Sequence, residues 1–201
     1  MKWIQALAWL ISGLFHPLLL GWALPAWVWA QEQNTWLRNP VDLQQWWLFS
    51  GLLVVPVLLL FLLKRLGHIG SFLLSQRAER NLVYAVMLGW FLIFSLLMEW
   101  LQAFGRECLV YDFLWLNTGC ILLLLPLNLS WNKASAHAAA VSASGVFHTA
   151  AALQEIPFWP MAGLWVLVLA SRYWLKAHSV AELCTGSLCG AAAAWLVLWL
   201  R

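Results

Sequence analysis

Several ionisable residues lie close together between two long apolar runs near the end of the chain. Ser171 and Arg172 are followed, within twelve residues, by His178 and Glu182. Ionisable side chains beside membrane-spanning segments are costly to desolvate, so they mark functional sites by default. A guanidinium can bind phosphate through two parallel hydrogen bonds, and a carboxylate can hold an imidazole in one tautomer. The stretch is therefore typical of a site that handles phosphate.

The carboxylate in this stretch also has a structural interpretation. Ser179-x-x-Glu182 matches the capping box, in which two side chains bond to each other's backbone N–H at a helix start. The same spacing would let Glu182 meet the imidazole of His178, four residues earlier. Both alternatives stay open for Glu182.

A second polar cluster, Asn-Lys-Ala-Ser-Ala-His at 132–137, opens another apolar run. Free N–H groups at a helix start bind anions, so we expect a phosphate near the backbone of Ser135 and the side chain of Lys133. Lys133 and His137 are four residues apart and would share one helix face. The alternative is a lysine that reaches the interface and a buried histidine that bonds to a neighbouring helix.

The rest of the chain is unusually apolar. Of its 201 residues, 64% are hydrophobic and 9% are charged, with a mean hydropathy of +0.79. A soluble domain is nearer half apolar and a quarter charged, so the composition indicates an integral membrane protein. Most of the seven apolar runs approach the roughly 20 residues that cross a bilayer as a helix. These runs are 3–30, 46–63, 82–101, 109–129, 135–153, 158–175 and 180–200.

Backbone groups in lipid must bond within their own segment, so the runs predict helices. We therefore predict an all-α fold, a polytopic membrane bundle of six to seven transmembrane helices that forms one domain over residues 1–201. The predicted connections include 31–45, 64–81 and a turn at 105–106, and the fourth run ends at 131–132. The four cysteines show no C-x-x-C spacing, and we predict neither a metal site nor a disulfide.

The first run resembles a signal peptide at its start, but its apolar length exceeds a signal core of about 7–15 residues. We expect a retained span that Pro17 and Pro25 interrupt, with His16 in a structural role. The fifth and last runs are rich in small residues, including Gly186 and Gly190. Small residues at this spacing let helices pack closely in lipid, which would bring the two polar clusters together.

Alternating the spans places segments 64–81, 131–137 and 171–179 on one face of the membrane. That face collects most of the lysines and arginines of the chain and few of its acids. By the positive-inside rule this face is cytoplasmic, with the N-terminus inside and the C-terminus outside.

The two clusters carry a family resemblance. Ser171-Arg172-x5-His178-x3-Glu182 resembles the third signature, S-R-x5-H-x3-D, of the membrane-bound type-2 phosphatidic acid phosphatases. Lys133-Ala-Ser-Ala-His137 resembles the second signature in the K-x-S-x-H form of a divergent bacterial branch. That branch tends to have a His-Pro pair in its first span, as at 16–17 here, and an arginine-rich segment before its third span.

The chain departs from the family pattern at three places. Glu182 replaces the usual Asp, and one extra methylene group still allows a contact with the imidazole. Ala134 and Ala136 replace the Pro and Gly of the P-S-G-H signature. The first signature, K-x6-R-P, is absent as written, and Arg80 with Arg77 is our predicted substitute.

The resemblance implies a phosphohydrolase of a bacterial inner membrane that needs no metal and no cofactor. His178 would attack phosphorus, Glu182 would orient it, and His137 would protonate the leaving oxygen. Lys133, Arg172 and the N–H groups near Ser135 would hold the phosphoryl oxygens. The substrate would be a lipid phosphomonoester or pyrophosphate, such as phosphatidate, phosphatidylglycerol phosphate or a polyprenyl pyrophosphate.

Two other functions fit the sequence. A phosphotransferase of the same architecture would pass the phosphoryl group to a lipid acceptor, and a non-catalytic membrane protein would use the basic face to bind anionic lipid or a partner. A transporter ranks below both, because the chain shows no internal repeat. The predicted partners are a lipid phosphate and the membrane, with no nucleic acid. The sequence does not indicate an oligomeric state.

Overall fold

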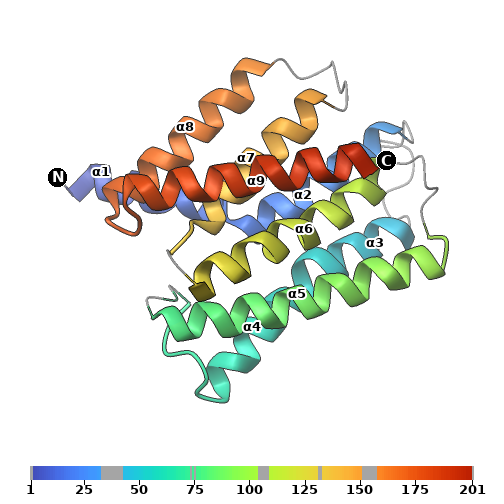
Figure 1. Ribbon diagram of the computed structural model, residues 1–201, viewed down its shortest axis with the longest axis horizontal. Coiled ribbons are helices and arrows are strands. Elements are labelled where there is room, and N and C mark those ends of the chain that lie inside the picture. Colours follow the sequence, from blue (N-terminus) through green and yellow to red (C-terminus); the bar gives the residue numbers. More distant parts are fainter. Residues whose placement is uncertain are drawn as a thin grey trace.

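The fold is a bundle of helices. The computed structural model describes residues 2–32, 43–72, 74, 76–103, 109–130, 133–150 and 158–200, and this part of the chain contains no strand. The predicted loop 31–45 lies largely outside the described residues, and the predicted turn 105–106 and the run end at 131–132 lie wholly outside them. The helices, shown in Figure 1, are α1 (Lys2–Leu14), α2 (Pro17–Glu32), α3 (Leu43–Phe49), α4 (Val55–Arg65), α5 (Arg77–Trp100), α6 (Leu109–Ser130), α7 (Ala136–Ala150), α8 (Phe158–Trp174) and α9 (Val180–Leu200), with a π-helical segment, Ser50–Val54, between α3 and α4.

Five helical segments in the described part are long and apolar enough to cross a membrane. They are Trp3–Gly21, Trp46–Arg65, Arg77–Trp100, Leu109–Ser130 and Val180–Leu200. This is compatible with an integral membrane protein and confirms the all-α class. The remaining long helices, α7 and α8, have 15 and 17 residues, so the predicted count of six to seven spans is not confirmed.

The first run is broken at Pro17, as predicted, but continues as helix through Pro25. A proline inside a helix has no N–H and leaves the carbonyl four residues earlier without its usual donor. For Pro25 that carbonyl is Gly21 O, and Asn117 Nδ2 from α6 donates to it at 3.3 Å. A neighbouring helix therefore supplies the missing hydrogen bond.

The basic segment before the third span is partly helical rather than a loop. We expected the loop to extend to residue 81, but α5 begins at Arg77, so Arg77 and Arg80 are in its first turn. Hydropathy marks only the apolar part of a helix, whereas arginine and glutamate are good helix formers. Glu79 Oε1 accepts a hydrogen bond of 2.7 Å from Gly70 N–H, which ties the preceding loop to the helix start.

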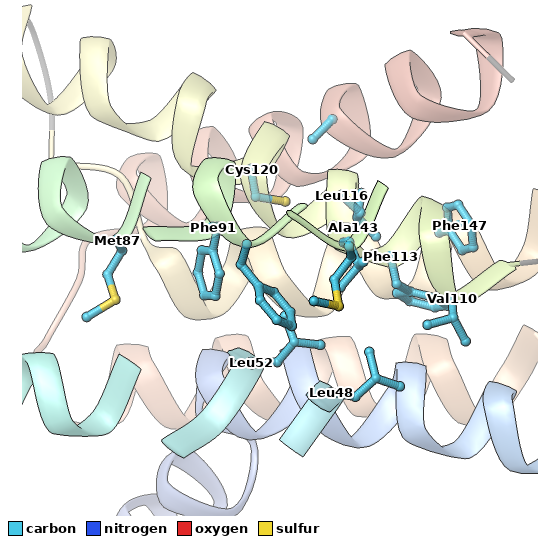
Figure 2. Packing of buried hydrophobic residues seen from close by; sticks show 14 of the residues in the cluster. Leu48, Leu52, Met87, Phe91, Val110, Phe113, Leu116, Cys120, Ala143 and Phe147 are labelled. Atoms are coloured by element: carbon cyan, nitrogen blue, oxygen red, sulfur yellow. The ribbon is translucent and has the colours of Figure 1, made fainter. Parts of the chain in front are cut away.

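The main core lies where α5, α6 and α7 meet the second run (Figure 2). Buried there are Leu48 and Leu52 from the second run, Phe91 from α5, and Phe113 and Phe147 from α6 and α7. The rings of Phe113 and Phe147 have centroids 4.6 Å apart. At one end of the bundle, on the left in Figure 1, α4, α6 and α8 end and α5, α7 and α9 begin. The core lies nearer the middle of the bundle than this end.

The predicted close packing of the fifth and last runs is confirmed. A methyl group on Gly190 of α9 would overlap the carbonyl oxygen of Ala139 in α7, and one on Gly186 would overlap that of Ser135. Ser142 Oγ donates to Ser187 O at 2.8 Å between the same two helices. The two glycines thus hold the starts of α7 and α9, and both polar clusters, beside each other.

Gly190→Ala should destabilise the protein by about 1–3 kcal/mol, because the added methyl group meets backbone that cannot move alone. Gly163→Ala on α8 is the matched control, since a methyl group there meets no atom within 4 Å. Alanine is the better helix former, so the control should unfold at an equal or higher temperature. Thermal unfolding in detergent, followed by circular dichroism, measures both. Equal midpoints for the two variants would contradict this account of the α7–α9 contact.

Candidate functional site

Both polar clusters border one cavity of about 270 Å³. Four of the eight predicted site residues line it, namely His137, His178, Arg172 and Arg80. They come from α7, the α8–α9 connection, α8 and α5, and all lie at the end of the bundle where these helices start or end (Figure 1). Segments far apart in the sequence therefore converge on one pocket.

The turn that carries His178 is set by the end of α8. Ala177 N–H donates to Arg172 O at 3.1 Å and Lys176 N–H donates to Tyr173 O at 2.9 Å. Lys176 has φ of 52°, in the left-handed region. This pattern is a Schellman motif, which ends a helix and turns the chain. It directs the chain from Arg172 straight to His178 and the start of α9.

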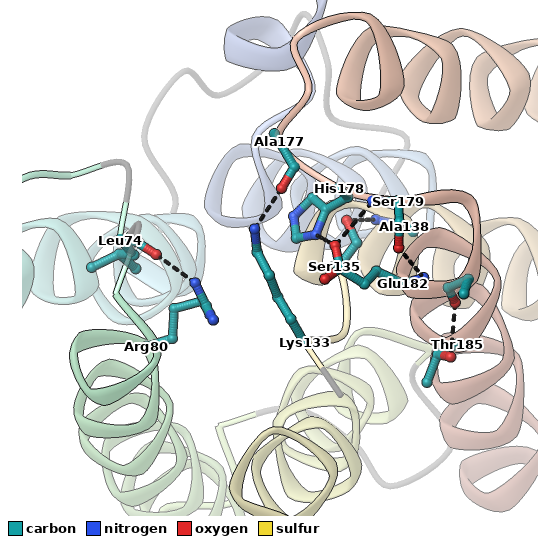
Figure 3. A network of polar contacts seen from close by, with 11 residues as sticks. Leu74, Arg80, Lys133, Ser135, Ala138, Ala177, His178, Ser179, Glu182 and Thr185 are labelled. Atoms are coloured by element: carbon teal, nitrogen blue, oxygen red, sulfur yellow. Dashed lines mark hydrogen bonds and ion pairs between the residues drawn. The ribbon is translucent and has the colours of Figure 1, made fainter. Parts of the chain in front are cut away.

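Glu182 fulfils both of the roles that the sequence left open. Its Oε2 accepts from Ser179 N–H at 3.0 Å, and Ser179 Oγ accepts from Glu182 N–H at 3.3 Å, which completes the capping box. The same Oε2 lies 3.1 Å from His178 Nδ1 (Figure 3). A carboxylate only accepts, so Nδ1 carries the proton and Nε2 keeps its lone pair.

The surroundings of His178 keep its imidazole neutral. Burial, and then the positive charges of Arg172, Lys133 and Arg80, together lower the pKa of His178 to about 3. The contact with Glu182 does not reverse this shift. At neutral pH the ring therefore presents an unprotonated Nε2, as a nucleophile requires.

Lys133 is placed differently from our expectation. It precedes α7 rather than lying in it, so the four-residue spacing to His137 does not put the two on one helix face. Its Nζ donates to Ala177 O at 2.6 Å, and Figure 3 shows its side chain between Arg80 and His178. Burial lowers the pKa of Lys133, and the nearby carboxylate of Glu182 opposes that shift. Lys133 thus ties the two clusters together and adds positive charge beside the cavity.

Ser135 begins α7. Its Oγ accepts from Ala138 N–H at 3.3 Å, as an N-cap does, and its own N–H donates to Glu182 O at 3.2 Å. That N–H is therefore engaged with α9. The first-turn N–H groups of α7 that follow, at Ala136 and His137, are the ones that a helix start leaves for an anion.

The first helix contributes residues that sequence reasoning did not place in the site. Arg172 Nη1 donates to Ser12 Oγ at 2.6 Å, and Ser12 Oγ lies 3.5 Å from His137 Nε2. Arginine only donates, so the hydroxyl accepts from it. The hydroxyl proton can go to Nε2 of a neutral His137, and the protonation of that ring sets the direction of this contact. The buried Nε of Arg172 has no hydrogen-bond partner among the described residues. Ser12 therefore orients both an arginine and an imidazole of the cavity.

His16 has the structural role that we expected and a contact with the site as well. Its Nδ1 accepts from Leu18 N–H at 3.3 Å, which caps the start of α2 before Pro17. Its ring packs edge-on against that of His137, with centroids 5.2 Å apart. One sequence signal was available, because Ser12 and His16 are polar residues four apart in an apolar run.

The two arginines proposed for the missing first signature have different surroundings. Arg80 is buried, lines the cavity, and donates from Nη1 to Leu74 O at 2.9 Å. Arg77 is exposed and does not line the cavity. Its guanidinium donates to Asn128 O at 2.6 Å and to Leu129 O at 2.8 Å, at the C-terminal end of α6. A cation is favoured at any helix C-terminus, which accounts for Arg77 without a ligand.

The cavity is thus lined by three imidazoles, those of His16, His137 and His178, the last with a carboxylate partner, and by two guanidiniums. Such an arrangement can bind and attack a phosphoryl group. Within the described ranges, no group of three or more His, Cys, Asp or Glu residues is placed to hold a metal ion. No protein-family model, curated protein or solved structure matches the chain, so its function has to be inferred from this geometry.

Proposed function

We propose that the protein is a lipid phosphatase that works through a phosphohistidine, with no metal in the reaction. The observation that carries this proposal is the imidazole of His178, held by Glu182 in a cavity with Arg172, Arg80 and the imidazole of His137. Phosphoryl transfer needs in-line placement of a nucleophile and clamped negative charge, and these residue types can supply both.

In the first step, Nε2 of His178 attacks phosphorus and the bond from phosphorus to the lipid oxygen breaks. Glu182 stabilises the positive charge that develops on the ring through Nδ1–H. His137, protonated once the anionic phosphoryl group lies beside it, gives its proton to the leaving oxygen, which departs as the lipid alcohol. Arg172 and Arg80 neutralise the phosphoryl oxygens, with Lys133 close by.

In the second step, water attacks the phosphohistidine. His137, now neutral, takes a proton from the water, the nitrogen–phosphorus bond breaks, and inorganic phosphate leaves with His178 restored. Splitting one difficult displacement into two easier ones is the benefit of a covalent nucleophile. Transfer to a lipid hydroxyl in place of water would use the same residues.

The proposal also includes the number of membrane spans, the membrane and the face on which the site lies. Counting α7 and α8 as spans in addition to the five longer segments gives seven, the upper number of the sequence prediction. We place the protein in a bacterial inner membrane with the site on the cytoplasmic face, where basic residues gather. The substrate is a phosphomonoester or pyrophosphate whose hydrocarbon part stays in the bilayer.

The proposal is tested by measuring phosphate release from purified protein in detergent with excess chelator. Phosphatidate, phosphatidylglycerol phosphate and polyprenyl pyrophosphate are the substrates to compare. Phosphate release that persists with chelator is expected. If a folded protein releases phosphate from none of them, and instead binds anionic vesicles in a salt-dependent manner, the non-catalytic lipid-binding function replaces this one.

The reactivity of His178 should not fall with pH as that of an ordinary histidine does. An imidazole with a pKa near 6.5 becomes about tenfold less reactive toward diethylpyrocarbonate between pH 7.5 and pH 5.5, because it protonates. With its pKa lowered to about 3, His178 stays neutral over this range and should react at a constant rate. Mass spectrometry of the labelled peptide, with N-acetylhistidine as an internal reference, measures the ratio. If the labelling rate of His178 falls as much as that of N-acetylhistidine, burial and the nearby positive charges do not lower its pKa as described.

Ser12→Ala should lower kcat by about tenfold, since Arg172 and His137 lose the hydroxyl that orients them. Ser12→Thr keeps a hydroxyl at the same position and should recover most of the loss. A purely structural role for Ser12 would lower the amount of folded protein and leave kcat per folded molecule unchanged. Steady-state kinetics normalised to folded protein separates the two cases.

A further inference from the structure

We propose that the cavity is a binding tube for one hydrocarbon chain, so that the substrate is a single-chain lipid phosphate and not a diacyl lipid. This inference rests on the proposed function, because it names the substrate of the same site. The polar end of the cavity holds the phosphoryl group, and the chain attached to it runs inward between the helices.

The cavity extends from the site toward the middle of the bundle. Along α5 its lining runs from Arg80 to Phe91, eleven residues, which is about 16 Å at 1.5 Å per residue. Beyond the arginines and imidazoles the lining is mainly apolar, and Met87, Phe91 and Phe113, which Figure 2 shows in the buried core, border its inner part. An elongated apolar space with a cationic end matches the shape and polarity of a phosphate on one chain.

The small residues of α7 create this space. His137, Ala140 and Ser144 follow one another on one face of the helix and all line the cavity. Ala139, which also lines the cavity, packs its backbone against Gly190 of α9. The short side chains of α7 therefore serve two purposes, because they admit α9 on one side and leave the tube open on the other.

The volume of the cavity limits how many hydrocarbon chains it can hold. An apolar cavity of about 150 Å³ holds one benzene molecule, that is, six carbon atoms. The 270 Å³ here would hold roughly ten carbon atoms on the same scale, and the phosphoryl group takes part of that space. One chain fits over its first carbon atoms, and a second chain beside it does not.

The cavity opens to the molecular surface near its polar end. Trp9 of α1, three residues before Ser12, and Phe72 of the α4–α5 loop line the cavity and are 51% and 52% exposed. Lys64 Nζ lies 4.2 Å from the centre of the Phe72 ring. A cation at this opening favours the approach of an anionic head group, while the aromatic rings suit the membrane interface.

The test compares decyl phosphate, butyl phosphate and diacyl phosphatidate as substrates of the full chain. Each buried methylene group is worth about a fourfold factor in binding, so kcat/KM for decyl phosphate should exceed both other values by at least about tenfold. Ala140→Leu adds three carbon atoms to the tube and should lower kcat/KM for decyl phosphate by about 10- to 50-fold. A circular-dichroism spectrum and an unfolding midpoint equal to those of wild type show that the variant is folded.

The matched control is Ala85→Leu, an exposed position on α5 that does not line the cavity and should behave as wild type. Similar kcat/KM for one-chain and two-chain lipids, or an Ala140→Leu protein that is unimpaired on decyl phosphate, would overturn the tube and leave the proposed function standing. If no substrate releases phosphate, the proposed function fails, and binding of a radiolabelled long-chain alkylphosphonate decides the tube alone. Binding that Ala140→Leu weakens and Ala85→Leu preserves would support it, and binding equal in all three proteins would overturn it.

Discussion

His178→Gln should abolish phosphate release, with kcat lowered by about 10⁴- to 10⁶-fold, the range seen when a covalent nucleophile or its base is removed. Glutamine keeps a polar side chain that can still donate to Glu182 Oε2, now 3.1 Å from Nδ1, so the start of α9 should survive. Glutamine has no basic nitrogen to replace Nε2 at this position. Wild-type protein quenched during turnover of ³²P-labelled substrate should carry acid-labile, base-stable label, and the variant should carry none.

His68→Gln is the matched control for this substitution. His68 lies in the α4–α5 loop at the same end of the bundle, is exposed, and does not line the cavity. Its replacement should leave both kcat and the phosphoprotein label unchanged. Label that persists in His178→Gln would mean that another residue accepts the phosphoryl group, and the proposed mechanism would then be wrong.

Local spacing in the sequence was sufficient to predict the arrangement around α9. Ser179, His178 and Glu182 lie within five residues of one another, and a helix start allows few geometries for them. The same holds for the helices, because a long apolar run in lipid has no alternative to helix. Lys133 shows the limit of this reasoning. Its four-residue spacing to His137 would place the two side chains on one helix face only if α7 included Lys133, and α7 starts at Ala136.

Contacts between distant segments could not be predicted in this way. Ser12 and Arg172 are 160 residues apart, and nothing in either neighbourhood specifies the other. Their contact depends on α1 packing against α8, which in turn depends on the break before Pro17 that sets the direction of α1. The cavity depends on how side chains of seven helices leave space between them, a property of packing that no single run contains.

Arg77 and Arg80 show why composition alone does not identify a site residue. Both are arginines at the start of α5, three residues apart, and the sequence offers no reason to separate them. In the structure one guanidinium lines the cavity and the other binds the carbonyls at the end of α6. The difference arises from the position of α6, whose last turn lies beside Arg77.

His137→Gln distinguishes an acid from a structural residue through the leaving group. A lipid alkoxide is a poor leaving group that needs a proton as its bond to phosphorus breaks, and general acid catalysis contributes about 10²- to 10⁴-fold to such a step. Nitrophenolate is a stable anion and leaves without one.

The variant should therefore lose about 10²- to 10⁴-fold in kcat/KM with an alkyl phosphate and less than about tenfold with nitrophenyl phosphate. His178→Gln, which lacks the nucleophile, should lose activity with both substrates. If His137 serves only to pack against His16 and accept from Ser12, its replacement disturbs the cavity in the same way for every substrate. Equal losses with the two leaving groups would thus remove His137 from the chemistry and leave His178 to act with some other proton donor.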